Sequence, residues 1–363
     1  MTQHPDHRFS RRDLLRGAAG LGLAAAAGTL LPACSRGGVD QGDDLRAAKT
    51  KPGDEPPPET TSIRLPNIFP VSCTAALALA EPFLREEGFT DIRYPKIPQN
   101  AAYDGLVALG GGEIDFNLGY GAVHLLRVEA GAPTVTLGGV HVGCWQVVAG
   151  GGIRSMVDFK GKTVAIAAPT GADGIFMAMT LANVGIDLRK DVNMVSYVPS
   201  EAADLLSSGR VDGLVAFPPI YQDLRARGIG TVVVNSMVDR PWSSYFCCMA
   251  TVRRDWMERH PVATRRALRA VLRASDVAAA EPERAARTMV DGGFTPDYDL
   301  AVAALKEIPY HVWREYDPVD TLRFYALRMK EAGLIEGTPD QLIKNGTDFR
   351  YLEELKKELK EAS

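Results

Sequence analysis

Hydrophobic and polar residues follow one another along the chain in an order that predicts strands and helices in regular succession. From Ser62, IRLPNIF is strand-like, the next residues form a loop and an amphipathic helix ending at Gly88, and DIRYPKI is strand-like again. The same order recurs over residues 162–198, where a strand through Ala167, a glycine-containing loop and a helix up to Gly185 precede VNMVSYV. The pattern predicts two lobes that each begin β-loop-α-β.

A second repeat supports the two lobes. The segments LVALGGGEIDFNLGYG and DLLSSGRVDGLVAFPP share a helix end, a glycine, and an aspartate that opens a strand. These residues are Gly112 and Asp115 in the first segment, and Gly209 and Asp212 in the second.

The loops that follow the predicted strands are the expected place for a ligand. In open α/β sheets, ligands bind outside the carboxyl ends of the strands, where loops and helix N-termini meet. Four loops qualify, at residues 67–74, 119–122, 168–174 and 217–221. If two lobes face each other, these loops line one crevice, and the crossovers near residues 144–149 and 242–248 act as hinges.

Composition and charge narrow the class of protein. The 363 residues are 46% hydrophobic and 24% charged, which is enough material for a large core and two domains. The net charge is -4 and no basic block follows the N-terminal segment, so no nucleic-acid partner is expected. Four cysteines lie beyond residue 34: Cys73, Cys144, Cys247 and Cys248. Buried apolar thiols are the favoured interpretation, and disulfides stay open.

The N-terminus reads as an export signal. Arg11 and Arg12 precede an uncharged run over residues 17–33, and SRRDLL resembles a twin-arginine motif. The run is too short to span a bilayer. LPAC resembles a lipobox, which makes Cys34 the lipidation site, residues 1–34 the signal peptide and residues 35–61 a flexible linker. An ordinary secretory signal, or a chance cysteine, is the alternative.

Other short motifs in the sequence do not support a prediction of nucleotide binding, metal binding or catalysis. GLGLAA lies inside the signal, and FKGKT at residues 159–163 has Met156 where a P-loop needs its first glycine. The six histidines include no i, i+4 pair, so a metal site would need long-range assembly. No nucleophile stands beside an evident base. The sequence therefore predicts no catalytic residue, no metal and no cofactor.

The order of several segments resembles a known family. They are ALGGGEIDFNLGYG, EAGAPTVTLGGV, DFKGKTVAI, LANVGIDLRKDVNMV, LSSGRVDGLVAFPP and HPVATRRALRAVLRA. This series resembles the periplasmic solute-binding proteins of ABC importers, in their nitrate, sulfonate, taurine and thiamine-pyrimidine (NMT1-like) branch. The resemblance implies an α/β type II periplasmic-binding-protein fold with two lobes, a hinge and an interlobe cleft. Lobe 1 would comprise residues 62–145 plus 242–345, lobe 2 residues 146–241, and residues 346–363 a C-terminal helical tail.

The loops and hinges supply the candidate ligand residues. They are Asn67, Phe69, Ser72, Cys73, Thr74, Tyr120, Trp145, Thr170, Gly171, Asp173, Phe217 and Trp242. The four loops hold aromatic residues but no lysine or arginine, which favours a heteroaromatic or sulfonate-like organic solute over a strongly hydrated small anion. Asp173 would accept from an amino group of the solute, or would only cap a helix. The first loop, PNIFPVSCTA, departs from the family's commoner pattern and leaves the ligand open.

The function implied is capture of a small solute by a lipid-anchored protein on the periplasmic or cell-surface face of the membrane. Its partners would be the solute, an ABC permease with its ATPase, and the membrane through the anchor, and the protein would be a monomer without enzymatic activity. One alternative is an enzyme like the thiamine-pyrimidine synthases, which carry a cysteine cluster on a segment related to Cys247 and Cys248. Strand alternation turns these two side chains to opposite faces. Another alternative is a ligand-sensing lipoprotein.

Overall fold

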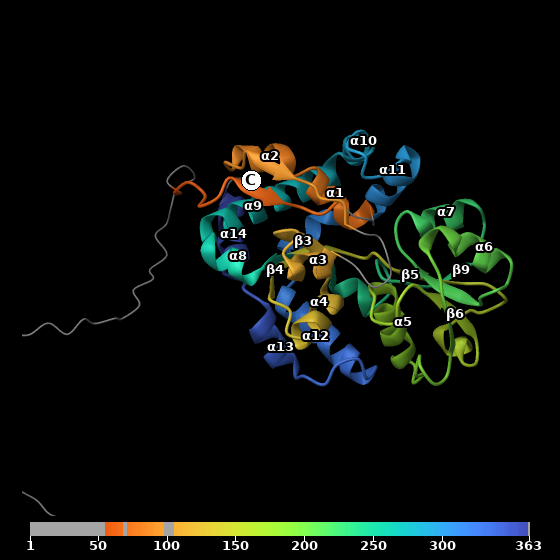
Figure 1. The fold of residues 1–363 in the computed structure, drawn as a ribbon. Helices are drawn as coiled ribbons and strands as arrows, with labels where there is room; N and C mark the ends of the chain where they lie inside the picture. Colours follow the sequence, from red (N-terminus) through yellow and green to blue (C-terminus); the bar gives the residue numbers. More distant parts are fainter. Residues whose placement is uncertain (1–54, 68–70, 98–104, 362–363) are drawn as a thin grey trace, which may run out of the picture. The chain divides into compact units, whose positions relative to one another are not determined.

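The computed structural model describes residues 55–67, 71–97 and 105–361 (Figure 1). The sequence predictions at Arg11, Arg12, Cys34 and Phe69 lie outside the described residues. Within the described part of the chain, no helix is both long and apolar enough to cross a membrane.

The first lobe is built on strands from both ends of the described chain. Parallel strands β1 (Ser62–Arg64) and β2 (Asp91–Arg93) pair with each other, while β10 (Phe246–Arg253) lies antiparallel between β3 (Phe116–Tyr120) and β4 (Thr134–Val142). Asp115 joins the two groups, because its backbone N–H donates to the Arg64 carbonyl at 2.9 Å. The strand order is therefore β2-β1-β3-β10-β4.

The second lobe repeats this order in one five-stranded sheet. Its strands are ordered β7 (Asn193–Ser196), β6 (Thr163–Ile166), β8 (Gly213–Ala216), β5 (Gln146–Ala149) and β9 (Thr231–Asn235). The first three are parallel, and β5 runs antiparallel to both of its neighbours. In each lobe the second parallel strand (β2 or β7) lies on the outer side of the first (β1 or β6). One antiparallel strand (β10 or β5) lies between the third strand (β3 or β8) and the fourth (β4 or β9). The α/β fold class predicted from the sequence is confirmed.

Two segments connect the lobes, and they are hydrogen bonded to each other. The chain leaves the first sheet after Val142 and enters the second at Gln146, then returns between Asn235 and Phe246. The Ser236 hydroxyl accepts from the backbone N–H of Cys144 at 3.2 Å and of Trp145 at 3.0 Å. The sequence predicts crossovers near residues 144–149 and 242–248, whereas the connecting segments are residues 143–145 and 236–245. Gly143, with φ +67°, packs so closely on Met237 that a Cβ would clash with that side chain.

Helices cover both sheets (Figure 1). In the first lobe they are α1 (Val71–Ala78), α2 (Glu81–Glu86), α3 (Gly105–Gly111), α4 (Gly121–Glu129), α8 (Arg254–Arg259), α9 (Pro261–Ala280), α10 (Pro282–Asp291), α11 (Tyr298–Glu307), α12 (Pro318–Glu331), α13 (Pro339–Gly346) and α14 (Arg350–Glu361). In the second lobe they are α5 (Ala172–Ala182), α6 (Ala202–Ser207) and α7 (Ile220–Ala226).

Helix limits agree with the sequence in some places and differ in others. Pro261 and Pro282 open α9 and α10, in the first helical turn where proline is favoured. The single helix expected before Gly88 is instead two helices, because the chain turns at residues 79–80 and Pro82 lies in the first turn of α2. The last helix, α14, is the helical part of the C-terminal tail predicted over residues 346–363, and its side chains Leu352 and Leu355 are fully buried.

Candidate functional site

Residues at the carboxyl ends of equivalent strands in the two lobes contact the same tryptophan side chain, Trp145. Tyr120 ends β3, the third strand of the first lobe, and Phe217 follows β8, the third strand of the second lobe. Trp145 lies on the first crossover, and its ring centroid is 5.6 Å from that of Tyr120 and 5.6 Å from that of Phe217. The three side chains thus link both lobes with the segment that connects them.

Further aromatic rings extend this contact into a closed circuit of six side chains, which we call the aromatic ring cluster. Successive ring centroids are 5.6 Å, 6.3 Å, 5.3 Å, 5.5 Å, 5.5 Å and 5.2 Å apart in the order Tyr120, Trp145, Phe176, Trp242, Phe324, Tyr325 and back to Tyr120. The cluster draws on β3, both crossovers, α5 and α12. Offset and edge-to-face contacts at these distances are the arrangements that aromatic side chains prefer.

Three members of the cluster were predicted from the sequence, and three were missed. Tyr120, Trp145 and Trp242 come from a predicted loop and the predicted hinges. Phe176 lies within the apolar helix α5, where its spacing looked like ordinary core. Phe324 and Tyr325 come from α12, which is far from the strand ends in the sequence. No sequence pattern indicates that this helix contacts them.

Cys247 lies beside this cluster but is poorly suited to act as a nucleophile. The side chain is 2% exposed, and it is a free thiol. Burial raises the pKa of the Cys247 thiol well above its ordinary value, and the neighbouring Cys144 thiol raises it further. The reactive form of cysteine is the thiolate, so this environment opposes the nucleophilic role that an enzyme would need.

The predicted residues of the first loop lie mostly inside the fold. Ser72, Cys73 and Thr74 were expected before a helix, but α1 begins at Val71, so they form its first turn and are buried. Asn67 forms an isolated parallel bridge with Lys96.

The cysteines also differ from the favoured sequence interpretation. Cys73 and Cys248 form a disulfide with an S–S distance of 2.15 Å, which joins α1 to β10. The interpretation of all four as buried free thiols is therefore wrong for this pair. Cys144 and Cys247 are free and buried.

The predicted residues before α5 have separate roles. Thr170 is exposed, and Gly171 is the N-cap residue of α5, so the alternative that Asp173 caps this helix is wrong. Asp173 stands in the first turn, where its Oδ2 accepts from the Ala167 N–H at 2.5 Å. Burial is the main influence on its carboxyl group and raises the pKa of Asp173 above its ordinary value, against the opposing effect of backbone N–H donors.

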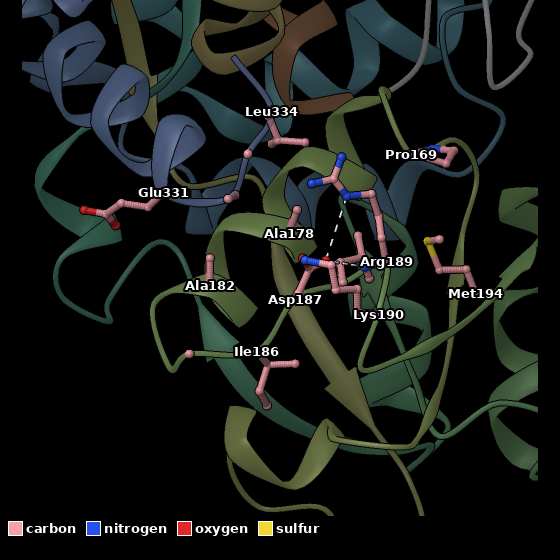
Figure 2. A pocket seen from close by; sticks show the side chains of 14 residues that line it. Pro169, Ala178, Ala182, Ile186, Asp187, Arg189, Lys190, Met194, Glu331 and Leu334 are labelled. Atoms are coloured by element: carbon pink, nitrogen blue, oxygen red, sulfur yellow. Dashed lines mark hydrogen bonds and ion pairs between the residues drawn. The ribbon is translucent and has the colours of Figure 1, made fainter. Parts of the chain in front are cut away.

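A cavity of about 420 Å³ lies elsewhere, between the end of α5, the loop that follows it and the turn after α12 (Figure 2). Its lining includes Arg189, Lys190 and Asp187, and the Lys190 ammonium is 3.0 Å from the Asp187 carboxylate. Among the described residues predicted to contact a ligand, none lines this cavity. It differs from the aromatic ring cluster in carrying cationic side chains.

Solved structures with a similar architecture include periplasmic binding proteins. The periplasmic nitrate-binding protein NrtA of Synechocystis PCC 6803 superposes with a TM-score of 0.69 at 15% identity, over 84% of this chain and 89% of that one. The alkanesulfonate-binding protein SsuA of Xanthomonas axonopodis pv. citri, bound to MOPS, gives a TM-score of 0.62 at 17% identity, over 77% and 96%. The chain has the periplasmic-binding-protein fold.

The sequence comparisons match part of the chain to a known family. Residues 147–290 match the model of the NMT1-like family, which confirms the resemblance seen in the sequence. A protein of Brucella abortus described as a binding protein is 26% identical over 178 residues, which are 49% of this chain and 54% of that protein. The chain thus spans about half the length of the curated relatives it matches.

Proposed function

We propose that this protein is the solute-binding component of an ABC importer. It captures a small organic solute between its two lobes outside the cytoplasm and delivers the solute to a membrane permease. The observation that carries the proposal is the contact of Tyr120 and Phe217, at equivalent strand ends of the two lobes, with Trp145 on the crossover between them.

This arrangement couples binding to movement of the lobes. A solute held among Tyr120, Trp145 and Phe217 contacts both lobes and the connecting segment at once. Because those contacts exist together only when the lobes are closed, differential affinity for the closed state shifts the population toward it. The relatives named above as binding proteins of nitrate and alkanesulfonate have the same fold, which supports this use of it.

The chemistry of the cluster favours a solute with a planar or apolar body. Tryptophan, tyrosine and phenylalanine rings offer large apolar faces, and each favourable aromatic contact adds about 0.5–1.5 kcal/mol beyond simple burial. The N-terminus of α5, which follows Gly171, adds the positive end of a helix dipole suited to a carbonyl, carboxylate or sulfonate at one end of the solute. A heteroaromatic or sulfonate-bearing organic solute fits both features.

The solute is best identified from the protein itself. The full chain is purified under native conditions from the membrane fraction of its own host, denatured, and the released small molecules are identified by mass spectrometry. The stripped protein is then titrated with each candidate by calorimetry. We expect a stoichiometric aromatic or heteroaromatic compound. Thermal shifts with nitrate or short alkyl sulfonates alone would refute the solute preference.

Variants locate the binding site. Phe217→Ala removes one half-buried ring of the strand-end contact and should weaken solute binding about tenfold. Trp256→Phe is the matched control, because Trp256 is buried in α8 outside the aromatic ring cluster. Arg189→Ala probes the cationic cavity, and a larger loss of affinity there than in Phe217→Ala would move the site to that cavity.

The place of the protein in the cell is a separate part of the proposal. Export through the motif at Arg11 and Arg12 and lipidation of Cys34 would hold the protein at the outer face of the cytoplasmic membrane, since acyl chains anchor more firmly than a peripheral contact. Cys34→Ser should move the protein from the membrane fraction to the soluble periplasmic fraction. Unchanged membrane association in that variant would contradict the anchor.

An enzyme on the same fold remains the main rival, because a fold does not fix a function. Recovery of the released solute unchanged after long incubation with the stripped protein supports capture, and its conversion supports the enzyme. A ligand-sensing lipoprotein is distinguished by uptake: deleting the gene should abolish import of the solute if the protein serves a permease.

A further inference from the structure

Three cysteines and a histidine from distant parts of the chain meet in the interior of the first lobe. Cys73 comes from α1, His141 from β4, Cys144 from the first crossover and Cys248 from β10. Their ligand atoms all lie within 4.8 Å of one another, and all four residues are buried. We call these four residues the cysteine-histidine cluster. Cys247, at the next position of β10, is not one of the four residues, although its thiol contacts the Cys144 thiol.

The histidine is oriented as metal-binding histidines are. The Nδ1 atom of His141 is 3.1 Å from the backbone carbonyl of Val142, and a carbonyl can only accept, so Nδ1 carries the proton. The unprotonated Nε2 then presents its lone pair. This atom is buried and has no hydrogen-bond partner among the described residues, although His141 is fully buried. A hydrogen bond from one ring nitrogen to a backbone carbonyl commonly fixes the other as a ligand.

The sulfur atoms have the spacing of a tetrahedral thiolate site. The Sγ atoms of Cys144 and Cys248 are 3.7 Å apart. With Zn–S bonds of about 2.3 Å, two sulfurs on a tetrahedral ion are about 3.8 Å apart. Cys73 stands in the first turn of α1, where the helix N-terminus favours a thiolate, and the Ser72 hydroxyl lies 3.5 Å from the Cys144 sulfur.

We infer that the reduced protein binds one thiophilic, tetrahedral metal ion of the Zn²⁺ type through Cys73, Cys144, Cys248 and the Nε2 of His141. Three sulfurs and one imidazole form a closed structural donor set for zinc. The ion would stabilise the base of both connecting segments, because Cys144 lies in the first and Cys248 comes just after the second. The disulfide between Cys73 and Cys248 is the metal-free, oxidised state of the same residues.

The two states interconvert by balanced steps. A dithiol reductant transfers two electrons and two protons to the disulfide, giving the Cys73 and Cys248 thiols, and is itself oxidised to a disulfide. The metal ion then displaces three thiol protons to solvent and takes up the neutral imidazole. Cysteines stay reduced in the cytoplasm, so folding before export, which the twin-arginine-like motif predicts, would let the ion bind before the disulfide forms.

The test uses the full chain carrying Cys34→Ser, which removes a thiol outside the described residues. After anaerobic reduction with a dithiol and removal of the reductant, the protein is titrated with Zn²⁺, and with Co²⁺ to observe thiolate-to-cobalt charge-transfer absorption. We expect one equivalent of either ion to bind to reduced protein and none to oxidised protein. X-ray absorption at the zinc edge should show three sulfur ligands and one nitrogen.

Variants separate the cluster from adventitious binding. Cys144→Ser and His141→Gln should each weaken Zn²⁺ binding by more than about a hundredfold. His124→Gln is the matched control for His141→Gln, because it removes a buried histidine outside the cysteine-histidine cluster and should bind as the parent does. Equal affinity in Cys144→Ser, a comparable loss in His124→Gln, or a zinc spectrum dominated by oxygen ligands would overturn the inference. The spectrum of the parent protein decides the question even if a variant fails to fold.

Discussion

His124 is a buried histidine whose protonation should make stability depend on pH. It lies on α4, its Nε2 donates to the Gly346 carbonyl at 2.9 Å, and the side chain is fully buried. Burial lowers the pKa of His124 from 6.5 to about 4. Between those values the unfolded chain binds more protons than the folded one, so the free energy of unfolding falls as the pH falls from 6.5 to 4.

Protonation of His124 in the unfolded chain should lower the free energy of unfolding by about 3 kcal/mol. This loss is complete below the folded-state pKa and absent above the unfolded-state pKa. Urea denaturation of the parent and of His124→Gln between pH 7 and pH 4 measures it. The difference in unfolding free energy between the two should change by about that amount across the range. His311→Gln, at an exposed position, should leave the profile of the parent unchanged. A parallel profile for His124→Gln would show that the pKa of His124 is the same in the folded and the unfolded chain.

Single site residues were predictable from the sequence where their position at the end of a strand determines where they lie in the fold. Tyr120 and Phe217 follow apolar strands, and strand ends gather ligand loops, so their selection needed no structure. The cysteine-histidine cluster was not predictable, because its members are separated by up to 175 residues and follow no local spacing. The disulfide between Cys73 and Cys248 depends on α1 packing beside β10, which is a property of the tertiary structure.

The repeated glycine-aspartate segments have the same structural role in both lobes. Asp115 accepts from the Arg64 N–H at 3.0 Å, and Asp212 accepts from the Thr163 N–H at 2.8 Å. In return, the backbone N–H of each aspartate donates to the carbonyl of the same partner. Each aspartate therefore fixes the start of the third strand beside the first strand of its lobe. The sequence repeat predicted the equivalence of these segments, although not this pair of hydrogen bonds.

Removing one of these carboxylates should destabilise the lobe that contains it. Asp212→Ala leaves the Thr163 N–H without its acceptor and should cost about 1–2 kcal/mol. Asp115→Ala should cost more, because Asp115 also pairs with the Arg64 guanidinium at 2.6 Å. Chemical denaturation measures both, and Asp204→Ala, at an exposed position on α6, is the control. Equal stability of Asp204→Ala and Asp212→Ala would show that the hydrogen bond contributes nothing.

Helix α9 is joined to both ends of the described chain by an ionic network. Arg269 is the central member, with nitrogen atoms 2.8 Å from Glu55, 2.6 Å from Glu87 and 3.0 Å from Glu358. Arg265 also reaches Glu55 at 2.7 Å. The network connects α9 to the start of the described chain, to the end of α2 and to α14.

Arg269→Ala should destabilise the protein by about 3 kcal/mol, because it leaves the buried Glu87 carboxylate without its partner. Thermal and urea unfolding measure the loss. Arg284→Ala breaks an exposed pair with Glu281 and should change stability by less than about 0.5 kcal/mol. Similar losses in the two variants would mean that burial does not determine the strength of the Arg269 contacts.

Helix limits were predictable where a proline marks the first turn. They were not predictable where tertiary packing determines them. Proline at the first helical position marked the starts of α9 and α10. The division of the segment before Gly88 into α1 and α2 was missed, because its apolar residues continue through the turn at residues 79–80. The apolar side of α14 was also visible in the sequence, but only its contact with the first lobe shows that Leu352 and Leu355 are core residues.

At the scale of the whole molecule, a partly exposed ion pair connects the two lobes directly. Arg225 on α7 of the second lobe contacts Glu307 at the end of α11 in the first. Because this pair is partly exposed to solvent, it contributes at most about 1 kcal/mol to the stability of the folded protein. It acts on the equilibrium between open and closed forms, however, because opening the lobes would break it while leaving each lobe folded.

Arg225→Ala should therefore separate affinity from stability. If the closed form binds the solute, the apparent dissociation constant is the intrinsic one divided by the closed fraction, so losing the pair should weaken binding by up to about fivefold. Calorimetry with the co-purified solute measures affinity, and the unfolding midpoint should not move. Arg227→Ala, which breaks a pair with Asp223 inside the second lobe, controls for loss of charge on the same helix. If Arg225→Ala and Arg227→Ala bind alike, the contact between α7 and α11 does not belong to the binding-competent state.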